Sequence, residues 1–97
     1  MEFLLKDNLI GWLFMEKKLY ENEALASREE FGNRIRKMRK EKGITQDKLS
    51  ELTDISARNI SDIENGKVNS TYSTIYVLAK AFGITMSELL DLDEKEE

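Results

Sequence analysis

A group of hydrogen-bonding side chains shares one face of a short predicted helix in the middle of the chain. Arg58, Asn59 and Asp62 lie on that face, whereas Ile60 and Ile63 point to the opposite side. A guanidinium and a carboxamide each offer a planar pair of hydrogen-bonding groups, and such pairs match the edges of nucleic-acid bases. A helix this short persists in water only when its apolar side is packed. The pattern therefore predicts a folded body that supports a small polar surface.

Five helices are predicted to build that body between residues 28 and 92. Each predicted start carries a capping residue, and two of these form capping boxes with Glu30 and Glu88. The capping residues are Ser27, Thr45, Ser56, Thr71 and Thr85. Glycine stops most of the helices, at Gly43, Gly66 and Gly83. Apolar residues at helical spacing predict the core, which comprises Phe31, Ile35, Met38, Leu49, Leu52, Ile60, Ile63, Ile75, Leu78, Ala79, Phe82, Met86, Leu89 and Leu90. No strand pattern appears, so the fold class is all-α.

The second and third predicted helices are joined by a turn too short for antiparallel packing. We expect them to cross steeply as a helix-turn-helix. The second helix of that motif fits the major groove of B-form DNA. Four residues then point outward from its N-terminal half, where base edges would lie: Ala57, Arg58, Asn59 and Asp62.

The amino-acid composition excludes most kinds of catalytic site. The chain has 97 residues, 40% hydrophobic and 35% charged, without histidine or cysteine. The usual general base, Ser-His and Cys nucleophiles, and thiolate metal sites are therefore excluded. We expect no enzyme, no cofactor and no metal. An intracellular, cytoplasmic location fits the absence of cysteine.

A basic run lies before the predicted motif, although the net charge is -4. Residues 34–42 carry six cations and a single acid, Glu41. Local potential governs the binding of a polyanion more than the total charge does. Helical spacing places Arg36, Lys37 and Lys40 off the predicted core face, where they are free to contact phosphates.

The segment FGNRIRKMRKEKGITQDKLSELTDISARNISDIENGK resembles the Cro/Xre type of helix-turn-helix, the lambda-repressor-like DNA-binding domain. The features GITQ, KLSELTDIS, NISDIENGK and LAKAFGIT follow in the family's order and spacing. The resemblance covers residues 28–92, about two thirds of the chain. It implies a five-helix, lambda-repressor-like domain, here with an extra N-terminal helical segment.

The resemblance also implies roles for single residues. Gln46 would contact a phosphate and brace the recognition helix, while Ser56 would donate to a phosphate at its N-terminus. Lys67 would lie near the DNA backbone. Arg39 and Glu64 match a pair that bridges two helices inside the domain. The base-reading positions correspond to Ala57, Arg58, Asn59 and Asp62.

The chemistry of these residues supports base reading unevenly. Arg58 suits guanine O6 and N7, and Asn59 suits adenine. Asp62 would be repelled by phosphates, so three interpretations stay open for it. It accepts from cytosine N4, it holds Arg58 across one helical turn, or it lies on a solvated face without a role.

Residues 1–26 precede the family segment and are strongly apolar for a surface helix. Their large apolar side chains are Phe3, Leu4, Leu5, Leu9, Ile10, Trp12, Leu13, Phe14, Met15, Leu19 and Leu25. Lys6, Asp7 and Gly11 interrupt the segment too often for a membrane span. It packs on a second subunit, on its own domain, or on another protein or a membrane surface. Met15 is a second candidate for the translation start. We divide the chain into this extension, a DNA-binding domain at 27–92 and a charged tail at 93–97.

The favoured function is a sequence-specific transcriptional regulator of bacterial or phage type, most simply a repressor. One short helix reads few base pairs, so we expect a homodimer on a palindrome in double-stranded DNA. Activation is an alternative, as is an antitoxin whose residues 1–26 bind a toxin, or a protein-interaction module without DNA binding. No small-molecule effector is expected, because no ligand-sensing domain follows residue 92.

Overall fold

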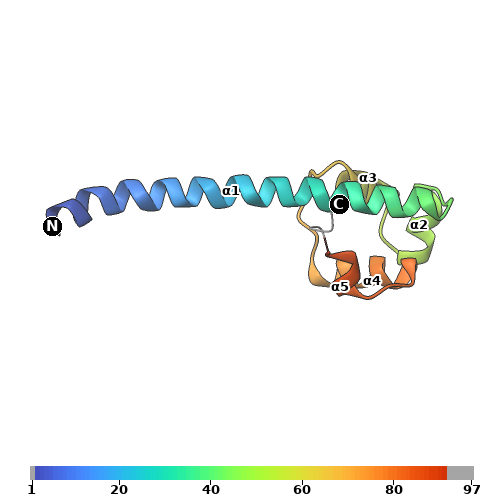
Figure 1. Cartoon of the computed structure of the whole chain (residues 1–97). Coiled ribbons are helices and arrows are strands. Elements are labelled where there is room, and N and C mark those ends of the chain that lie inside the picture. Colours follow the sequence, from blue (N-terminus) through green and yellow to red (C-terminus); the bar gives the residue numbers. More distant parts are fainter. Residues whose placement is uncertain (1, 92–97) are drawn as a thin grey trace.

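The chain folds into five helices in the computed structural model, which describes residues 2–91 and the side chains of residues 10–13 and 15–91. The helices are α1 (Glu2–Glu41), α2 (Gln46–Thr53), α3 (Ala57–Glu64), α4 (Tyr72–Phe82) and α5 (Met86–Leu89) (Figure 1). Residues 2–91 contain no strand, so the predicted all-α fold with five helices is confirmed. The tail predicted at 93–97 lies outside the described residues.

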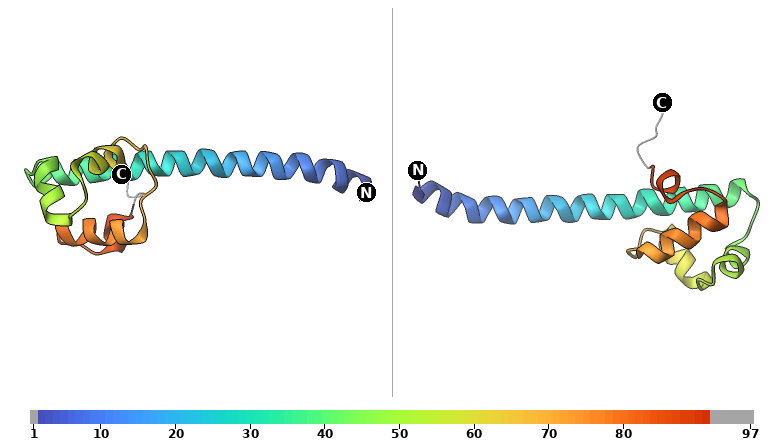
Figure 2. Two further views of the ribbon diagram at one scale, coloured as in Figure 1. Left: turned by 180° about the vertical axis from the view of Figure 1, so that it is seen from behind. Right: turned by 90° about the horizontal axis from the view of Figure 1, so that it is seen from below.

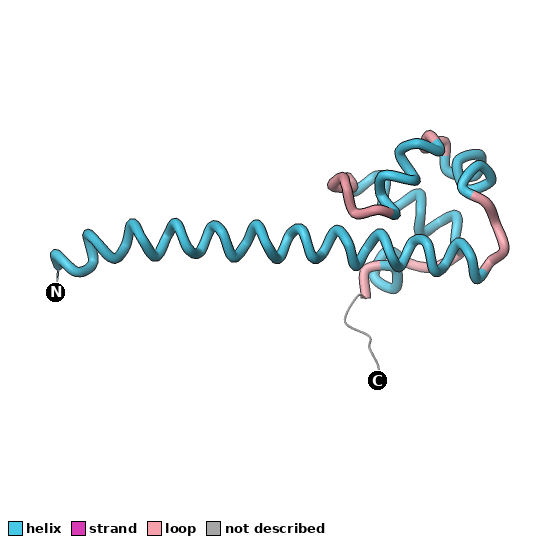
Figure 3. Tube along the Cα trace, turned by 90° about the horizontal axis from the view of Figure 1, so that it is seen from above, coloured by secondary structure: helices cyan, strands magenta, loops and turns pink. Residues whose placement is uncertain are grey.

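Helix α1 sets the shape of the molecule. It has 40 residues, and at about 1.5 Å per residue this length matches the longest dimension of the molecule, 59 Å. Its C-terminal part packs against α2 to α5, whereas its N-terminal part projects away from them in every view (Figure 2 and Figure 3). The molecule therefore consists of a small helical domain and a single protruding helix.

The predicted helix start at Ser27 is wrong. Ser27 lies inside α1, and the helix runs without interruption from the extension into the domain. A serine and a glutamate three residues apart also occur on the surface of a continuous helix. The segment between Gly11 and Gly32 contains no other glycine, and the chain has no proline, so nothing breaks the helix there.

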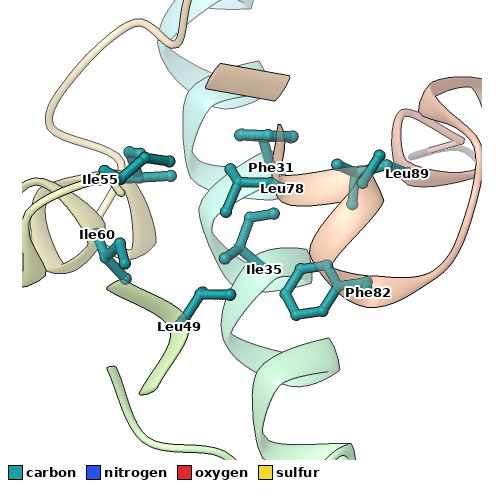
Figure 4. Close-up of a cluster of buried hydrophobic side chains, with 10 residues drawn as sticks. Phe31, Ile35, Leu49, Ile55, Ile60, Leu78, Phe82 and Leu89 are labelled. Atoms are coloured by element: carbon teal, nitrogen blue, oxygen red, sulfur yellow. The ribbon is translucent and has the colours of Figure 1, made fainter. Parts of the chain in front are cut away.

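The core is built around the C-terminal part of α1. Phe31 and Ile35 project from it, and Ile35 is fully buried. Figure 4 shows Ile35 between α2 and α3 on one side and α4 and α5 on the other. The buried apolar residues are Phe31, Ile35, Leu49, Ile55, Ile60, Ile63, Leu78, Ala79, Phe82 and Leu89. These residues fix α3 on the domain.

Two residues predicted for the core are exposed. Leu52 is 52% exposed and Leu90 is 43% exposed. The buried face of α2 is taken by Leu49 and Thr53, and the Thr53 hydroxyl donates to the Leu49 carbonyl at 2.7 Å. This bond lets a polar residue fill a place expected for leucine. Leu90 is the C-cap of α5 and lines an open pocket beside Phe31.

The other predicted helix starts are confirmed. Thr45, Ser56, Thr71 and Thr85 each accept a hydrogen bond from the backbone N–H three residues later. Thr85 and Glu88 form the complete capping box. Most of the helix bounds of the domain therefore follow from local side-chain chemistry.

A close crossing fixes α3 against α1. At Gly32, a Cβ atom would overlap the Ile63 carbonyl oxygen and come within 2.8 Å of the Glu64 carbonyl oxygen. Only glycine leaves room for the two backbones to approach this closely. The crossing sets the position of α3 relative to α1.

Candidate nucleic-acid interface

Helix α3 presents its polar face to solvent and buries its apolar face. Ile60 is fully buried and Ile63 is 2% exposed, whereas Arg58 and Asn59 are exposed. Ser56 caps the helix, and its Oγ accepts from the Asn59 N–H at 3.0 Å. The exposed side chains of Arg58 and Asn59 therefore project from a helix whose position is fixed.

The four base-reading candidates are not equally accessible. Ala57 and Asp62 are half-buried, whereas Arg58 and Asn59 stand free on the surface. The ion pairs of the described residues do not include one between Arg58 and Asp62. The interpretation that Asp62 holds Arg58 therefore has no support in the structure.

A buried carboxylate ties α3 to α1 and α2. Glu64, at the end of α3, is 2% exposed. Arg39 on α1 donates to it twice, from Nε to Oε2 at 2.6 Å and from Nη2 to Oε1 at 3.1 Å. Gln46 on α2 donates from Nε2 to Oε1 at 3.1 Å. This network holds the helix-turn-helix in one geometry on the body of the domain.

The environment of Glu64 favours its charged form. Burial alone would raise the pKa of the carboxyl group, but hydrogen bonds from Arg39 and Gln46 and the charges of Arg39 and Arg36 lower it by more. The pKa of Glu64 is therefore below its ordinary value. The pKa of Arg39 is raised by its hydrogen bond to Glu64, so both partners stay charged.

Arg36 is not free, contrary to the sequence-based prediction. Its Nη2 donates to Asn65 Oδ1 at 2.8 Å, and its Nε lies 3.5 Å from Glu64 Oε1. Sequence spacing placed it correctly off the core face but could not show that the end of α3 lies beside it. Asn65, the C-cap residue of α3, is thus a partner of Arg36 that no local pattern indicates.

The other predicted phosphate contacts divide into exposed cations and residues at helix starts. Lys37, Lys40 and Lys67 are exposed. Gln46 is the first residue of α2 and is held by Glu64, and Ser56 is the N-cap of α3. Because Ser56 Oγ accepts from the backbone, its own O–H can still donate outward.

Another arginine of α1, for which the sequence predicted no role, contacts the other end of the domain. Arg34 donates from Nε to the Leu89 carbonyl at 2.9 Å and from Nη2 to the Glu88 carbonyl at 2.7 Å. It thereby satisfies the free carbonyls at the end of α5. The two sides of this contact are 54 and 55 residues apart in the sequence, so no spacing rule could have revealed it.

Two further features bear on the class of site. Among the described residues, no helix is long and apolar enough to cross a membrane. The same residues hold no group of three acidic, histidine or cysteine side chains placed to bind a metal ion.

Comparison with known proteins identifies the family. The model of the helix-turn-helix domain matches residues 32–95. The chain is 39% identical over 67 residues to control protein C.MunI from Mycoplasma sp, a match that covers 68% of this chain and 90% of that protein. It is 37% identical over 59 residues to the immunity repressor protein of Bacillus phage phi105, covering 61% of this chain and 41% of that protein.

Similarity to a solved structure supports the same family. The restriction-modification controller protein C.AhdI from Aeromonas hydrophila superposes with a TM-score of 0.64 at 33% identity, covering 66% of this chain and 97% of that one. The family match begins at Gly32, where α1 enters the domain, and includes all of α2 to α5. The chain therefore belongs to the helix-turn-helix family of DNA-binding transcriptional regulators, of the Cro/Xre type.

Proposed function

We propose that this regulator represses transcription by binding a palindromic operator as a homodimer. The exposed N-terminal half of α3 carries the proposal, because Arg58 and Asn59 stand free on a helix fixed by the buried Glu64 network. One helix of eight residues spans few base pairs. Two copies related by a two-fold axis read half-sites about one DNA turn apart.

In this proposal Arg58 binds guanine and Asn59 binds adenine in the major groove. Ala57 contacts an apolar base edge such as the thymine methyl group. Asp62 accepts from cytosine N4, since the structure shows no bond between it and Arg58. Each good bidentate contact discriminates by about 1–3 kcal/mol.

Phosphate contacts supply the rest of the affinity. Lys37, Lys40 and Lys67 are exposed cations, and Gln46 and Ser56 lie at the starts of α2 and α3. Helix N-termini favour anions because their backbone N–H groups are free. Arg36 would have to release Asn65 before it could join this set.

Selection of binding sites from random-sequence DNA tests the proposal. We expect the full chain to enrich a palindrome, and Arg58→Ala to lose one base preference in each half-site. Lys40→Ala should instead weaken binding to all sequences alike and lower the salt dependence. Lys17→Ala, an exposed cation far from α3, is the matched control and should change neither property.

Enrichment of no sequence at low salt, where phosphate contacts are strongest, would contradict DNA reading altogether. Repression itself is tested by transcription in vitro from a promoter that overlaps the selected site. We expect transcription to fall as the protein saturates that site, whereas an activator would raise it.

A further inference from the structure

The protruding part of α1 carries a stripe of residues that no described part of the domain covers. The stripe, which we call the outer seam, consists of Trp12, Met15, Leu19, Asn22 and Ala26. The first three are 53%, 58% and 53% exposed. Their spacing alternates between three and four residues, which lines up one side of a helix and is the pattern by which two helices pair in a coiled coil.

The outer seam lies on the side of α1 that faces away from the core. The seam ends at Ala26, because beyond it the same side of α1 meets the end of α3: a Cβ atom on Gly66 would come within 3.1 Å of the Glu29 Cα atom. Phe31 and Ile35, which enter the core, lie around the other side of the helix. A second helix along the outer seam would therefore lie opposite the side of α1 that enters the core.

The remaining apolar stripe is less suitable for a second helix. Ile10 and Leu13 belong to it, but Lys17 interrupts it. It leads to a cavity of about 250 Å³ lined by Ala24 and by Val68 from the loop after α3. A helix packed along this stripe would run into that loop, so the outer seam is the open surface.

We infer that the outer seam binds the outer seam of a second copy of this chain, as a parallel two-helix coiled coil. Charge supports this occupant and this direction. Lys18 and Glu23 flank the seam on opposite sides, and a parallel pair places Lys18 of each copy beside Glu23 of the other. An antiparallel pair would instead place Lys18 beside Lys18 and Glu16 beside Glu16 across the axis.

Asn22 fits the same arrangement. A single polar residue within an apolar seam lowers affinity but fixes the register of the two helices. The parallel direction also places both DNA-binding domains at the same end of the helix pair. The inference rests on the proposed homodimeric regulator and names the segment that joins the two copies.

Sedimentation equilibrium of the full chain without DNA tests the seam. Leu19→Glu places a charge in the seam, and we expect it to raise the dimer dissociation constant about tenfold or more. Leu13→Glu is the matched control, because Leu13 is 51% exposed on the other stripe. It should leave dimerisation nearly unchanged. An equal effect of the two variants, or a monomeric unmodified chain, would overturn the inference.

Disulfide formation tests the direction. The chain has no cysteine, so Ala26→Cys introduces a single thiol per copy within the seam. A parallel pair brings the two thiols face to face, and we expect a cross-linked dimer under mild oxidation. Ala24→Cys, also exposed but on the other stripe, should not cross-link. A dimer in which Ala26→Cys stays uncross-linked, or in which Ala24→Cys cross-links equally, would overturn the parallel pair.

The two proposals fail in different measurements. A chain that dimerises through the seam but enriches no DNA sequence contradicts the operator-binding function and leaves the seam standing. A chain that binds its operator but sediments as a monomer without DNA contradicts the seam alone. The apolar extension would then be assigned to a different protein, as in the antitoxin alternative.

Discussion

The two halves of α1 have the same backbone and opposite surroundings. From Phe31 onward the helix buries one face in the domain, and Ile35 is fully enclosed. Among the described side chains before Ala24, at residues 10–13 and 15–23, none belongs to the core, and Ile10 is 70% exposed. Apolar residues are frequent in both halves. Hydrophobic composition therefore does not say whether a helical segment is core; the presence of other helices beside it does.

The two halves of α1 also differ in the role that their side chains can have. The packed half positions α3 through the close crossing at Gly32 and the hydrogen bonds of Arg39 and Arg36, so these three residues support the helix that carries the base-reading candidates. The bare half makes no such contacts, and its exposed stripe is available to a second copy. Matched substitutions in the two halves can test this difference directly.

The largest contrast is expected between two isoleucines of α1. Ile35→Ala should destabilise the domain by about 2–5 kcal/mol, because it leaves a cavity in the core. Ile10→Ala should change the free energy of unfolding by no more than about 0.5 kcal/mol, since the side chain is already exposed. Urea unfolding followed by circular dichroism measures both. A comparable loss at Ile10 would show that the extension packs on its own domain.

Two glycines of α1 should respond in opposite directions. Gly32→Ala should cost about 3 kcal/mol, because the added methyl group meets the backbone of α3. Gly11→Ala should stabilise the helix by about 1 kcal/mol, since nothing lies within 4 Å of the added atom. Thermal unfolding of the two variants gives the signs. A stabilising Gly32→Ala would mean that α1 and α3 are not in close contact.

Acid should weaken the packed half through Glu64. Its pKa is lower in the folded chain than the ordinary value of 4.5, so the unfolded chain takes up this proton first as the pH falls. The stability that Glu64 contributes is present above pH 4.5 and decreases as the pH falls through the folded pKa. The free energy of unfolding, measured from pH 7 down to pH 3, should therefore fall in the unmodified chain as Glu64 takes up its proton.

Glu64→Gln should remove the part of this acid-induced loss of stability that comes from Glu64, because an amide does not titrate. Glu30→Gln, at an exposed glutamate of α1, is the control and should leave the acid slope nearly unchanged. An identical slope in the unmodified chain and in Glu64→Gln would contradict the role of Glu64 as the buried charged link between α1, α2 and α3.

The smallest contrast concerns two serines. Ser56→Ala should cost about 1 kcal/mol, because it removes the N-cap of α3. Ser27→Ala lies inside a continuous helix and should stabilise the chain by a few tenths of a kcal/mol, since alanine is the better helix former. Thermal unfolding resolves the two signs. A loss of stability in Ser27→Ala would indicate that a helix begins there after all.

Much of the domain could be predicted from local patterns. Four of the capping residues, the left-handed stop at Gly83 and the inward positions of Ile60 and Ile63 depend only on nearby sequence. The exposed face of α3 followed from the same periodicity. Leu52 was misjudged because Thr53, whose hydroxyl donates to the Leu49 carbonyl, takes the buried place on α2. The partner of Arg36 could not be predicted because Asn65 lies 29 residues away in the sequence.

The sequence by itself determined where α2 to α5 begin, which face of α3 is polar, and that the chain has no histidine or cysteine chemistry. These properties depend on spacings of three or four residues, over which helical geometry acts directly. The tertiary structure decided that α1 is continuous, that Glu64 is the buried junction of three helices, and that the outer seam is bare. Each of these depends on distant segments meeting, or failing to meet, in space.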